Sequence, residues 1–403
     1  MNLEDSIGLI ELGNTNLKCL IFKINKDNNS EILSVTTTPS DGIYNDVVVN
    51  LKKASDSIRL AISTAEKKAK VSLKKINVIF EQPDFLCTRF SKHKKIDDSK
   101  IHRSDIEFLL NEGKKQLMLN DKNQSIIHIF NHNYIVDGKI FIEEPINVFA
   151  DTLTHEMTFI TAPKNNLRNV NQIFLNCDIE IERLISQTFA LGVELFDERE
   201  LQSGVVLINL GLKKISLGLF KNLALVHSIT FPIGVDHITS DISKVCSLNL
   251  EESLAIRNNI DFSFENNKNI FDENNILKKS FFINSKFRKI SKDLIYKVIR
   301  ARTDEILEMI KKQLKVTSFN FSSGMNFFLI GEGSNFINLQ EYCQNFFELN
   351  TVVGRKDNLE KGFSACQGGI RIIKEGWETE AIPEIKIKNI EKVGFLRKIF
   401  GDL

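Results

Sequence analysis

Residues 7–22 read IGLIELGNTNLKCLIF, and residues 205–220 read VVLINLGLKKISLGLF. At a constant offset of 198 positions, identical residues meet: Leu9 with Leu207, Ile10 with Ile208, Leu12 with Leu210, Gly13 with Gly211 and Phe22 with Phe220. Each copy is an apolar run, a glycine-containing turn and a second apolar run, which predicts a hairpin whose first strand is buried on both faces. The alternative, two unrelated apolar hairpins, stays open on these residues alone.

The sequence around the two hairpins favours a duplication. After the first copy, residues 51–69 have apolar positions at helical spacing. After the second copy come a strand-like run at 224–232 and a helix-like stretch at 250–257. A strand at 326–330 then runs into the turn Gly331-Glu332-Gly333-Ser334, followed by a helix at 336–347. Two α/β halves, each opened by a hairpin that faces a shared cleft, describe the actin-like (ribonuclease-H-like) ATPase fold.

Composition narrows the class of protein. Apolar residues make up 42% of the 403 residues, and 53 basic residues nearly balance 52 acidic ones, which argues against a nucleic-acid binder. The six cysteines form no CxxC pair, which favours buried thiols in a reducing compartment over disulfides or a metal site. There is no N-terminal apolar leader and no run of 18 apolar residues, so we expect a cytoplasmic chain that neither is secreted nor spans a membrane.

Five motifs in a fixed order resemble the bacterial division protein family FtsA. They are DEREL at 197–201, ITFPIGVDHITSDI at 229–242, VIRARTDEI at 298–306, FLIGEGS at 328–334 and GFSACQGG at 362–369. The resemblance covers nearly the whole chain. It implies an actin-like duplicated fold with a small inserted subdomain peculiar to the family and a C-terminal amphipathic helix.

The resemblance also implies a division of the chain into subdomains. The first would be 1–83 and 164–200, the inserted one 84–163, the third 201–246 and 316–375, and the fourth 247–315, followed by a linker at 376–388 and an amphipathic helix at 389–403. The linker assignment also rests on Pro383 and a lack of periodicity. The Asn-rich stretch 261–275 is interpreted as a solvated loop or hairpin insertion.

The last fifteen residues, NIEKVGFLRKIFGDL, place an apolar stripe on one side of a helix. We expect Ile390, Val393, Phe395, Leu396, Arg397, Lys398, Ile399 and Phe400 to contact lipid. The alternative is a terminal helix docked on the protein body. Burying six large apolar side chains would contribute roughly 9–18 kcal/mol in full, but ordering each residue costs roughly 1–2 kcal/mol. Stable membrane residence would therefore need several tails, which a filament of this chain provides.

The three turns that would face a nucleotide depart from the pattern of actin-like proteins. We take the nucleotide-site candidates to be Glu11, Gly13, Asn14, Thr15, Asn16, Asn209, Gly211, Lys213, Lys214, Gly331 and Gly333. Where the second turn of such proteins reads DIGGGTxD, this chain has an amide at Asn209, Leu212 and Lys213 in place of two glycines, and Ser216 in place of the last acid. A Cβ at these positions obstructs the close backbone approach that phosphate binding needs.

No cofactor is certain on this pattern, and ATP is the candidate ligand of a degraded site. Three outcomes stay open: an empty cleft closed by Leu212, metal-independent ATP binding through Lys213 and Lys214, and ATP hydrolysis. We expect no metal site, and no Ser/His/Asp or cysteine-nucleophile context stands out. His128 and His132 lie four residues apart on an expected strand and are interpreted as surface histidines rather than metal ligands.

By resemblance, the chain would be a non-enzymatic membrane tether and assembly factor for the FtsZ ring, at the division site on the cytoplasmic side of the inner membrane. Its implied partners are the FtsZ C-terminal peptide, inner-membrane lipids, further copies of itself and other division proteins, with no nucleic acid. Arg302 and Glu305, which share one helix face, would bind the peptide. The alternatives are an actin-like ATPase of the cell-shape or sugar-kinase type and the type IV pilus assembly relative of the same fold.

Overall fold

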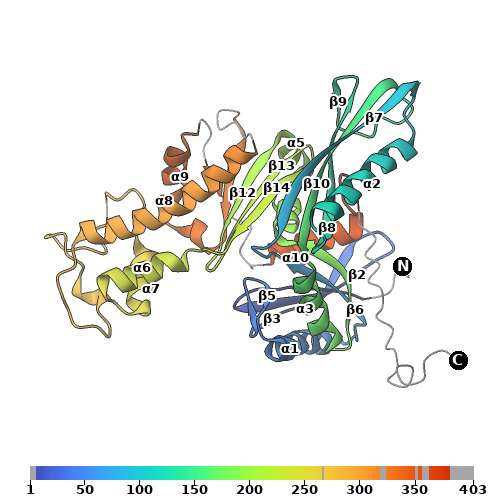
Figure 1. Cartoon of the computed structure of the whole chain (residues 1–403). Coiled ribbons are helices and arrows are strands. Elements are labelled where there is room, and N and C mark those ends of the chain that lie inside the picture. The colour runs from blue at the N-terminus through green and yellow to red at the C-terminus, as the bar shows by residue number, and fades with distance from the viewer. Residues whose placement is uncertain (1–5, 266, 318–323, 350–352, 356–362, 382–403) are drawn as a thin grey trace.

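The computed structural model describes residues 6–265, 267–317, 324–349, 353–355 and 363–381. The described chain is arranged in three lobes around a central pair of sheets (Figure 1). One lobe carries α1 and α3, a second carries α6, α7 and α8, and a third is the inserted domain with β7 to β10 and α2.

The first half is built on a five-stranded sheet in the order β11-β6-β1-β2-β3. Its strands are β1 (Ile7–Glu11), β2 (Asn16–Ile24), β3 (Ser30–Pro39), β6 (Lys75–Phe80) and β11 (Glu180–Ser186), with a small hairpin of β4 (Ile43–Tyr44) and β5 (Val47–Val48). Helices α1 (Leu51–Ala69) and α3 (Lys164–Leu175) pack against one another and on this sheet. Helix α1 begins where the side chain of Asn50 accepts a hydrogen bond from the Lys53 amide, and it covers the expected residues.

The second half repeats that topology. Its strands are β12 (Val205–Leu210), β13 (Ile215–Lys221), β14 (Ala224–Phe231), β15 (Asn326–Ile330) and β16 (Val353–Arg355), in the order β14-β13-β12-β15-β16. In each half the first strand is central, forms an antiparallel hairpin with the second, and pairs in parallel with a strand from much later in that half.

The strand register confirms the duplication read from the sequence. In the first hairpin Ile7 pairs with Phe22 and Glu11 with Lys18; in the second Val205 pairs with Phe220 and Asn209 with Ser216. Every one of these partners is related by the same offset of 198. Strand β1 is buried along its whole length and β12 nearly so, as expected for central strands.

The inserted domain lies between β6 and α3 in sequence. Its sheet has the order β7-β10-β8-β9 and consists of β7 (Leu86–Lys100), β8 (Gln124–Val136), β9 (Lys139–Phe141) and β10 (Phe149–Pro163), with α2 (Arg103–Asn120) against it. It has two small hydrophobic clusters of its own, one of which contains Ile129, Leu117 and Met157.

The α6–α8 lobe contains α6 (Asp236–Cys246), α7 (Leu250–Asn259), the short 3-10 helix η1 (Lys279–Phe281) and α8 (Lys292–Val316). The interpretation of 261–275 as a solvated loop or hairpin insertion holds only for residues 272–275, which are exposed at a turn closed by an antiparallel bridge between Phe271 and Leu277, and is wrong for the apolar residues before them. Phe262, Phe264, Ile270 and Phe271 are buried in this stretch, and Phe262 stacks on Phe336 with ring centroids 5.4 Å apart. The many asparagines made this stretch look solvated, although its aromatic side chains are buried in a segment whose described residues form no helix or extended strand.

The last helix of the described residues, α10 (Ser364–Glu375), returns to the first half and packs between β1 and α4 (Gln187–Leu195). Two glycines permit this close approach: a Cβ at Gly368 would lie 1.9 Å from the Ala190 carbonyl oxygen, and one at Gly369 would lie 2.8 Å from a methyl of Ile79 and 2.9 Å from one of Leu9. The remaining helices are α5 (Glu198–Ser203) and α9 (Leu339–Phe347). Helix α5 begins with a capping box between Asp197 and Glu200.

All six cysteines are free thiols. Burial raises the pKa of Cys19, Cys87 and Cys343 to about 12. Within the described ranges, no helix combines the length and apolar character needed to cross a bilayer, and no three His, Cys, Asp or Glu side chains are gathered as a metal site would need.

Candidate functional site

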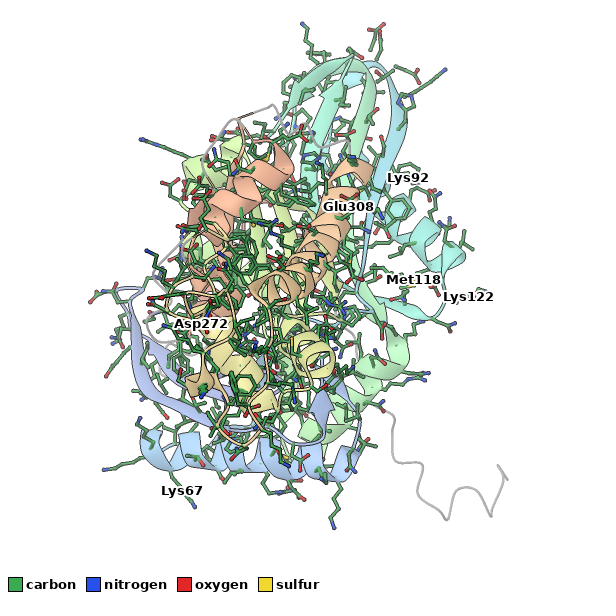
Figure 2. The ribbon with its side chains drawn as sticks, turned by 90° about the vertical axis from the view of Figure 1, so that its left-hand side faces the viewer. Lys67, Lys92, Met118, Lys122, Asp272 and Glu308 are labelled. Carbon is green, nitrogen blue, oxygen red and sulfur yellow. The ribbon has the colours of Figure 1, made fainter. Side chains whose placement is uncertain are left out.

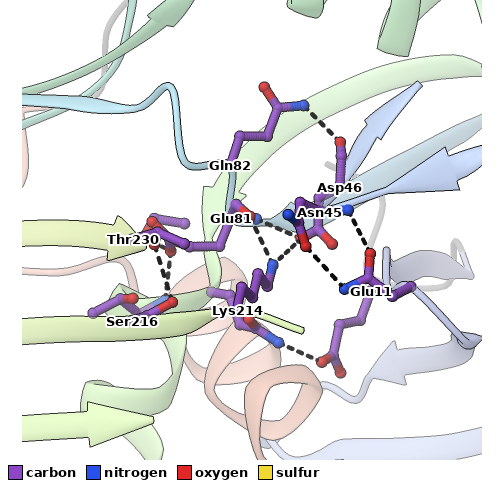
Figure 3. A network of polar contacts seen from close by, with 12 residues as sticks. Glu11, Asn45, Asp46, Glu81, Gln82, Lys214, Ser216 and Thr230 are labelled. Carbon is purple, nitrogen blue, oxygen red and sulfur yellow. Dashed lines mark hydrogen bonds and ion pairs between the residues drawn. The ribbon is translucent and has the colours of Figure 1, made fainter. Parts of the chain in front are cut away.

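A buried ion pair joins the turn of the second hairpin, between β12 and β13, to the β4–β5 turn of the first half (Figure 3). Lys214, in the β12–β13 turn, places its Nζ 2.6 Å from Asp46 Oδ2 and 2.6 Å from the Glu81 carbonyl oxygen. The side chain of Asp46 is 0% exposed and that of Lys214 12%. A cation from the second half therefore fills the space where the first half presents its acceptors.

Asp46 also accepts hydrogen bonds from its own half of the protein. The Glu81 amide donates to Asp46 Oδ2 at 2.8 Å, and Gln82 Nε2 donates to the Asp46 carbonyl at 2.6 Å. Burial raises the pKa of the Asp46 carboxyl, although the nearby Lys214 acts in the opposite direction. The neighbouring Glu81 carboxylate, whose pKa burial also raises, accepts from Ser186 Oγ at 2.7 Å and from the Thr188 amide at 2.8 Å.

The turn of the first hairpin, between β1 and β2, is hydrogen-bonded to neighbouring parts of the first half. The side-chain amide of Asn14 donates to Asn45 Oδ1 at 3.3 Å, and its oxygen accepts from the Asn45 amide. Glu11 is buried, and its carboxylate accepts from Lys18 Nζ at 3.2 Å and from Gln187 Nε2 at 2.7 Å. Of the remaining candidates in this turn, Gly13 is half-buried and Thr15 and Asn16 are exposed.

The second turn is covered by the chain that follows β14. The amides of Val235 and Asp236 donate to the carbonyls of Gly211 and Leu212, each at 3.0 Å. A Cβ at Gly234 would lie 2.2 Å from the Leu212 carbonyl oxygen. Only glycine therefore allows the backbone after β14 to approach the backbone of the second turn this closely. Leu212 itself is half-buried against the core.

Lys213 is paired as well. Its Nζ lies 3.0 Å from Asp236 Oδ2, while Arg257 from α7 lies 2.9 Å from Asp236 Oδ1. The Arg257 guanidinium is also 5.8 Å from the ring centroid of Phe336. Asp236 thus joins the second turn to α7.

The third turn begins at Gly331, which has a positive φ of 83°, and continues into the 3-10 helix η2 (Glu332–Asn335). A Cβ at Gly331 would lie 2.5 Å from Asn209 Oδ1, and one at Gly333 would lie 2.6 Å from a methyl of Val235. The structure therefore brings together the candidates Asn209 and Gly211 of the second turn and Gly331 and Gly333 of the third.

These residues do not fit a magnesium–nucleotide complex in the arrangement described. The ammonium groups of Lys213 and Lys214, the candidate phosphate ligands, both have carboxylate partners from the protein itself. The segment that carries Val235 and Asp236 is hydrogen-bonded onto the second turn. The side chains of Leu212 and Lys213 stand where a phosphate-binding turn has glycine. The arrangement acts as a protein-built joint between the halves.

The candidate peptide-binding pair lies away from these turns, on α8. Arg302 Nε is 2.6 Å from Asp241 Oδ2 on α6, and its Nη1 is 2.5 Å from Glu305 Oε2. The hydrogen bond that Arg302 donates to the Asp241 carboxylate raises the pKa of Arg302, which stays charged. Arg302 and Glu305 share one helix face, as expected, but Arg302 also joins α8 to α6. The membrane-contact candidates from Ile390 to Phe400 lie outside the described residues.

Sequence reasoning missed a buried site where the segment after α10 meets β8. The histidines taken for surface residues are buried: His128 is 0% exposed and His132 8%. His128 Nδ1 lies 2.6 Å from Glu380 Oε1, and its Nε2 accepts from the Ser186 amide at 2.9 Å. The first residues of the expected linker at 376–388 are docked on the body, so for Trp377 to Ala381 the linker interpretation is wrong.

Comparison with known proteins gives a consistent result. A family model described as the SHS2 domain inserted in FTSA matches residues 86–161, the stretch that holds α2 and the strands around it. Curated relatives named cell division protein FtsA include those of Agrobacterium fabrum (21% identical, 87% of this chain and 81% of the relative) and Buchnera aphidicola subsp. Acyrthosiphon pisum (23%, 87% and 84%). That of Bacillus subtilis is 24% identical over 78% of this chain and 71% of its own.

Solved structures share the fold. A chain of the PilM-PilN type IV pilus biogenesis complex aligns with a TM-score of 0.57 at 12% identity, over 92% of this chain and 97% of its own. The nucleotide-free diol dehydratase-reactivating factor aligns with a TM-score of 0.51 at 7% identity, over 92% and 99%. At these identities the likeness concerns the actin-like fold alone.

Proposed function

Because this chain belongs to the FtsA family of actin-like cell division proteins, we propose that it acts as a tether and assembly factor for the FtsZ ring on the inner membrane face. The observation that carries the proposal is the agreement between the inserted-domain match at 86–161 and relatives named FtsA that align over most of the chain. The amphipathic pattern of residues 389–403 supports lipid as the second partner.

Binding of the FtsZ C-terminal peptide is the direct test. The peptide, immobilised, should retain the full chain from solution, and a scrambled peptide of the same composition is the control. Equal retention by both peptides would reject a specific FtsZ contact.

The same preparation, mixed with vesicles that contain anionic lipid, should sediment with them, and replacing Phe395 and Phe400 by Glu should abolish sedimentation. Sedimentation unaffected by these changes would reject the tail as anchor.

The proposal includes a role that does not depend on nucleotide hydrolysis. Its support is the pairing of Lys213 and Lys214 with Asp236 and Asp46, which leaves neither ammonium free for phosphate. Titration calorimetry with ATP and Mg²⁺ should therefore show no magnesium-dependent binding. Tight, magnesium-dependent binding would reject this part of the proposal and favour the alternative, an actin-like ATPase.

A further inference from the structure

The segment that follows α10 is attached to three parts of the protein at once. We call residues Trp377–Ala381 the clasp. Trp377 Nε1 donates to the Leu223 carbonyl at 2.6 Å, and Thr379 Oγ1 donates to the same oxygen at 3.0 Å. Leu223 lies in the turn between β13 and β14, so these two hydrogen bonds hold the clasp to the second half.

The clasp also extends the sheet of the inserted domain. The Asn131 amide donates to the Thr379 carbonyl at 2.7 Å, and the Ala381 amide donates to the Ile129 carbonyl at 2.9 Å. Phe130 and Glu380 form an antiparallel bridge between these two hydrogen bonds. The clasp therefore pairs with β8 just before the part of that strand that pairs with β9. Ala381 packs into the same hydrophobic cluster as Ile129 and Leu117.

A buried carboxylate fixes the clasp in register. The Glu380 side chain is 1% exposed, and its two oxygens are 2.6 Å from His128 Nδ1 and 2.5 Å from Arg183 Nη2. His128 belongs to the inserted domain and Arg183 to β11 of the first half. A shift of the clasp by one residue along β8 would move the Glu380 carboxylate away from His128 and Arg183. The carboxylate would then be buried without these partners, which is costly, so the ion pairs fix the register.

We propose that the clasp fixes the point at which the C-terminal tail leaves the body, and so sets which side of the protein faces the membrane. The proposal rests on the proposed function of residues 389–403 as the anchor. Counted from Ala381, seven residues separate the body from that helix and can span at most about 25 Å. Without the clasp the free segment would start at Gly376, and its thirteen residues could span about 45 Å.

The exit point lies beside the C-terminal end of α2, since Leu117 of α2 and Ala381 share one cluster. Figure 2 places Met118 and Lys122 together at that end, on the edge of the inserted domain. Leu119 there is 71% exposed. In Figure 1, α2 and α7 lie on opposite sides of the molecule, and Leu250 at the start of α7 is 63% exposed. The clasp therefore holds the α2 side close to the membrane and the α7 side away from it.

Amide hydrogen exchange on the full chain tests the clasp without any membrane. The amides of Asn131 and Ala381 should be protected in the wild type. Glu380→Ala should abolish their protection and leave the β8–β10 amides unchanged, while Glu380→Gln, which keeps a hydrogen-bond acceptor, should retain part of it. Glu378→Ala is the matched control, because Glu378 is exposed in the same segment and its loss should change neither amide. An unprotected Ala381 amide in the wild type would overturn the proposal.

A fluorophore on Leu119→Cys or Leu250→Cys tests the orientation, with vesicles that carry an acceptor lipid. The native thiols, whose raised pKa values slow their reaction, set the background in the unsubstituted chain. The Leu119 label should be quenched more strongly than the Leu250 label, and Glu380→Ala should remove the difference. Equal quenching at both positions with an intact clasp would overturn the proposal. A chain that fails to bind vesicles would instead reject the tether, while the exchange data would still decide whether the clasp forms.

Discussion

The ion pair between Lys214 and Asp46 makes a quantitative prediction about the joint between the halves. Lys214→Met removes the ammonium but keeps most of the side-chain volume, and it leaves the fully buried Asp46 carboxylate with one amide donor, that of Glu81. Removing one partner of a buried ion pair typically costs about 3–5 kcal/mol. We expect the free energy of unfolding to fall by that amount. Lys213→Met is the matched control: Lys213 is 42% exposed and paired with a partly exposed Asp236, so its loss should cost under about 1 kcal/mol.

The double variant Lys214→Met/Asp46→Asn separates the ion pair from other effects of the lysine. The introduced asparagine keeps an acceptor for the Glu81 amide without a buried charge, so the two substitutions should be coupled by about 2 kcal/mol in a double-mutant cycle. Urea unfolding is followed by the fluorescence of Trp377, the single tryptophan, and by circular dichroism, since coincident transitions are needed for a two-state treatment. A single variant as stable as the wild type, or a cycle with purely additive effects, would refute the reasoning.

Three further predictions concern other parts of the chain. Deleting 389–403 should release the protein from vesicles without changing the thermal midpoint, and a lowered midpoint would instead indicate a helix docked on the body. Arg302→Glu should abolish FtsZ-peptide binding, whereas Asp241→Asn, which frees Arg302 from α6, should preserve it in the same fluorescence-anisotropy titration. Burial would raise the pKa of Glu252, but hydrogen bonds from Ser285 and from backbone amides outweigh it and lower the pKa to about 2. The resulting stabilisation is present above about pH 4.5 and lost as the pH falls toward 2, so Glu252→Gln should flatten the acid limb of a stability–pH curve.

The parts of the fold that local patterns determine were predictable. The paired hairpins, helix α1 and strand β15 follow from apolar periodicity and glycine turns, and the structure has them where the sequence indicates. The loss of the phosphate-binding pattern in the second turn was also predictable, because the replacement of glycines by Leu212 and Lys213 is visible in the sequence. What the sequence could not provide was the partner of Lys214: Asp46 lies 168 positions away and belongs to a short hairpin with no distinctive pattern.

The clasp was missed for a similar reason. A single strand added to a sheet edge over three residues has no periodicity to detect, and the neighbouring Pro383 favours a linker. Glu380 is an ordinary acid until His128 and Arg183 surround it. His128 in turn looks like a surface residue of β8, because neither the clasp nor β11, which cover it, is close to it in sequence. Long-range contacts made these residues buried, and no local signal indicates them.

The position of α10 has a consequence for how the chain is made. Gly369 rests on the side chains of Leu9 and Ile79, so the central strands of the first half are covered by a helix that is translated more than 280 residues after β6. Domains usually fold as they emerge, N-terminal part first. Here apolar side chains of β1 and β6 stay without the cover of α10 until that helix has been translated. We therefore expect truncated chains that end before α10 to expose this apolar surface and to be retained by holding chaperones.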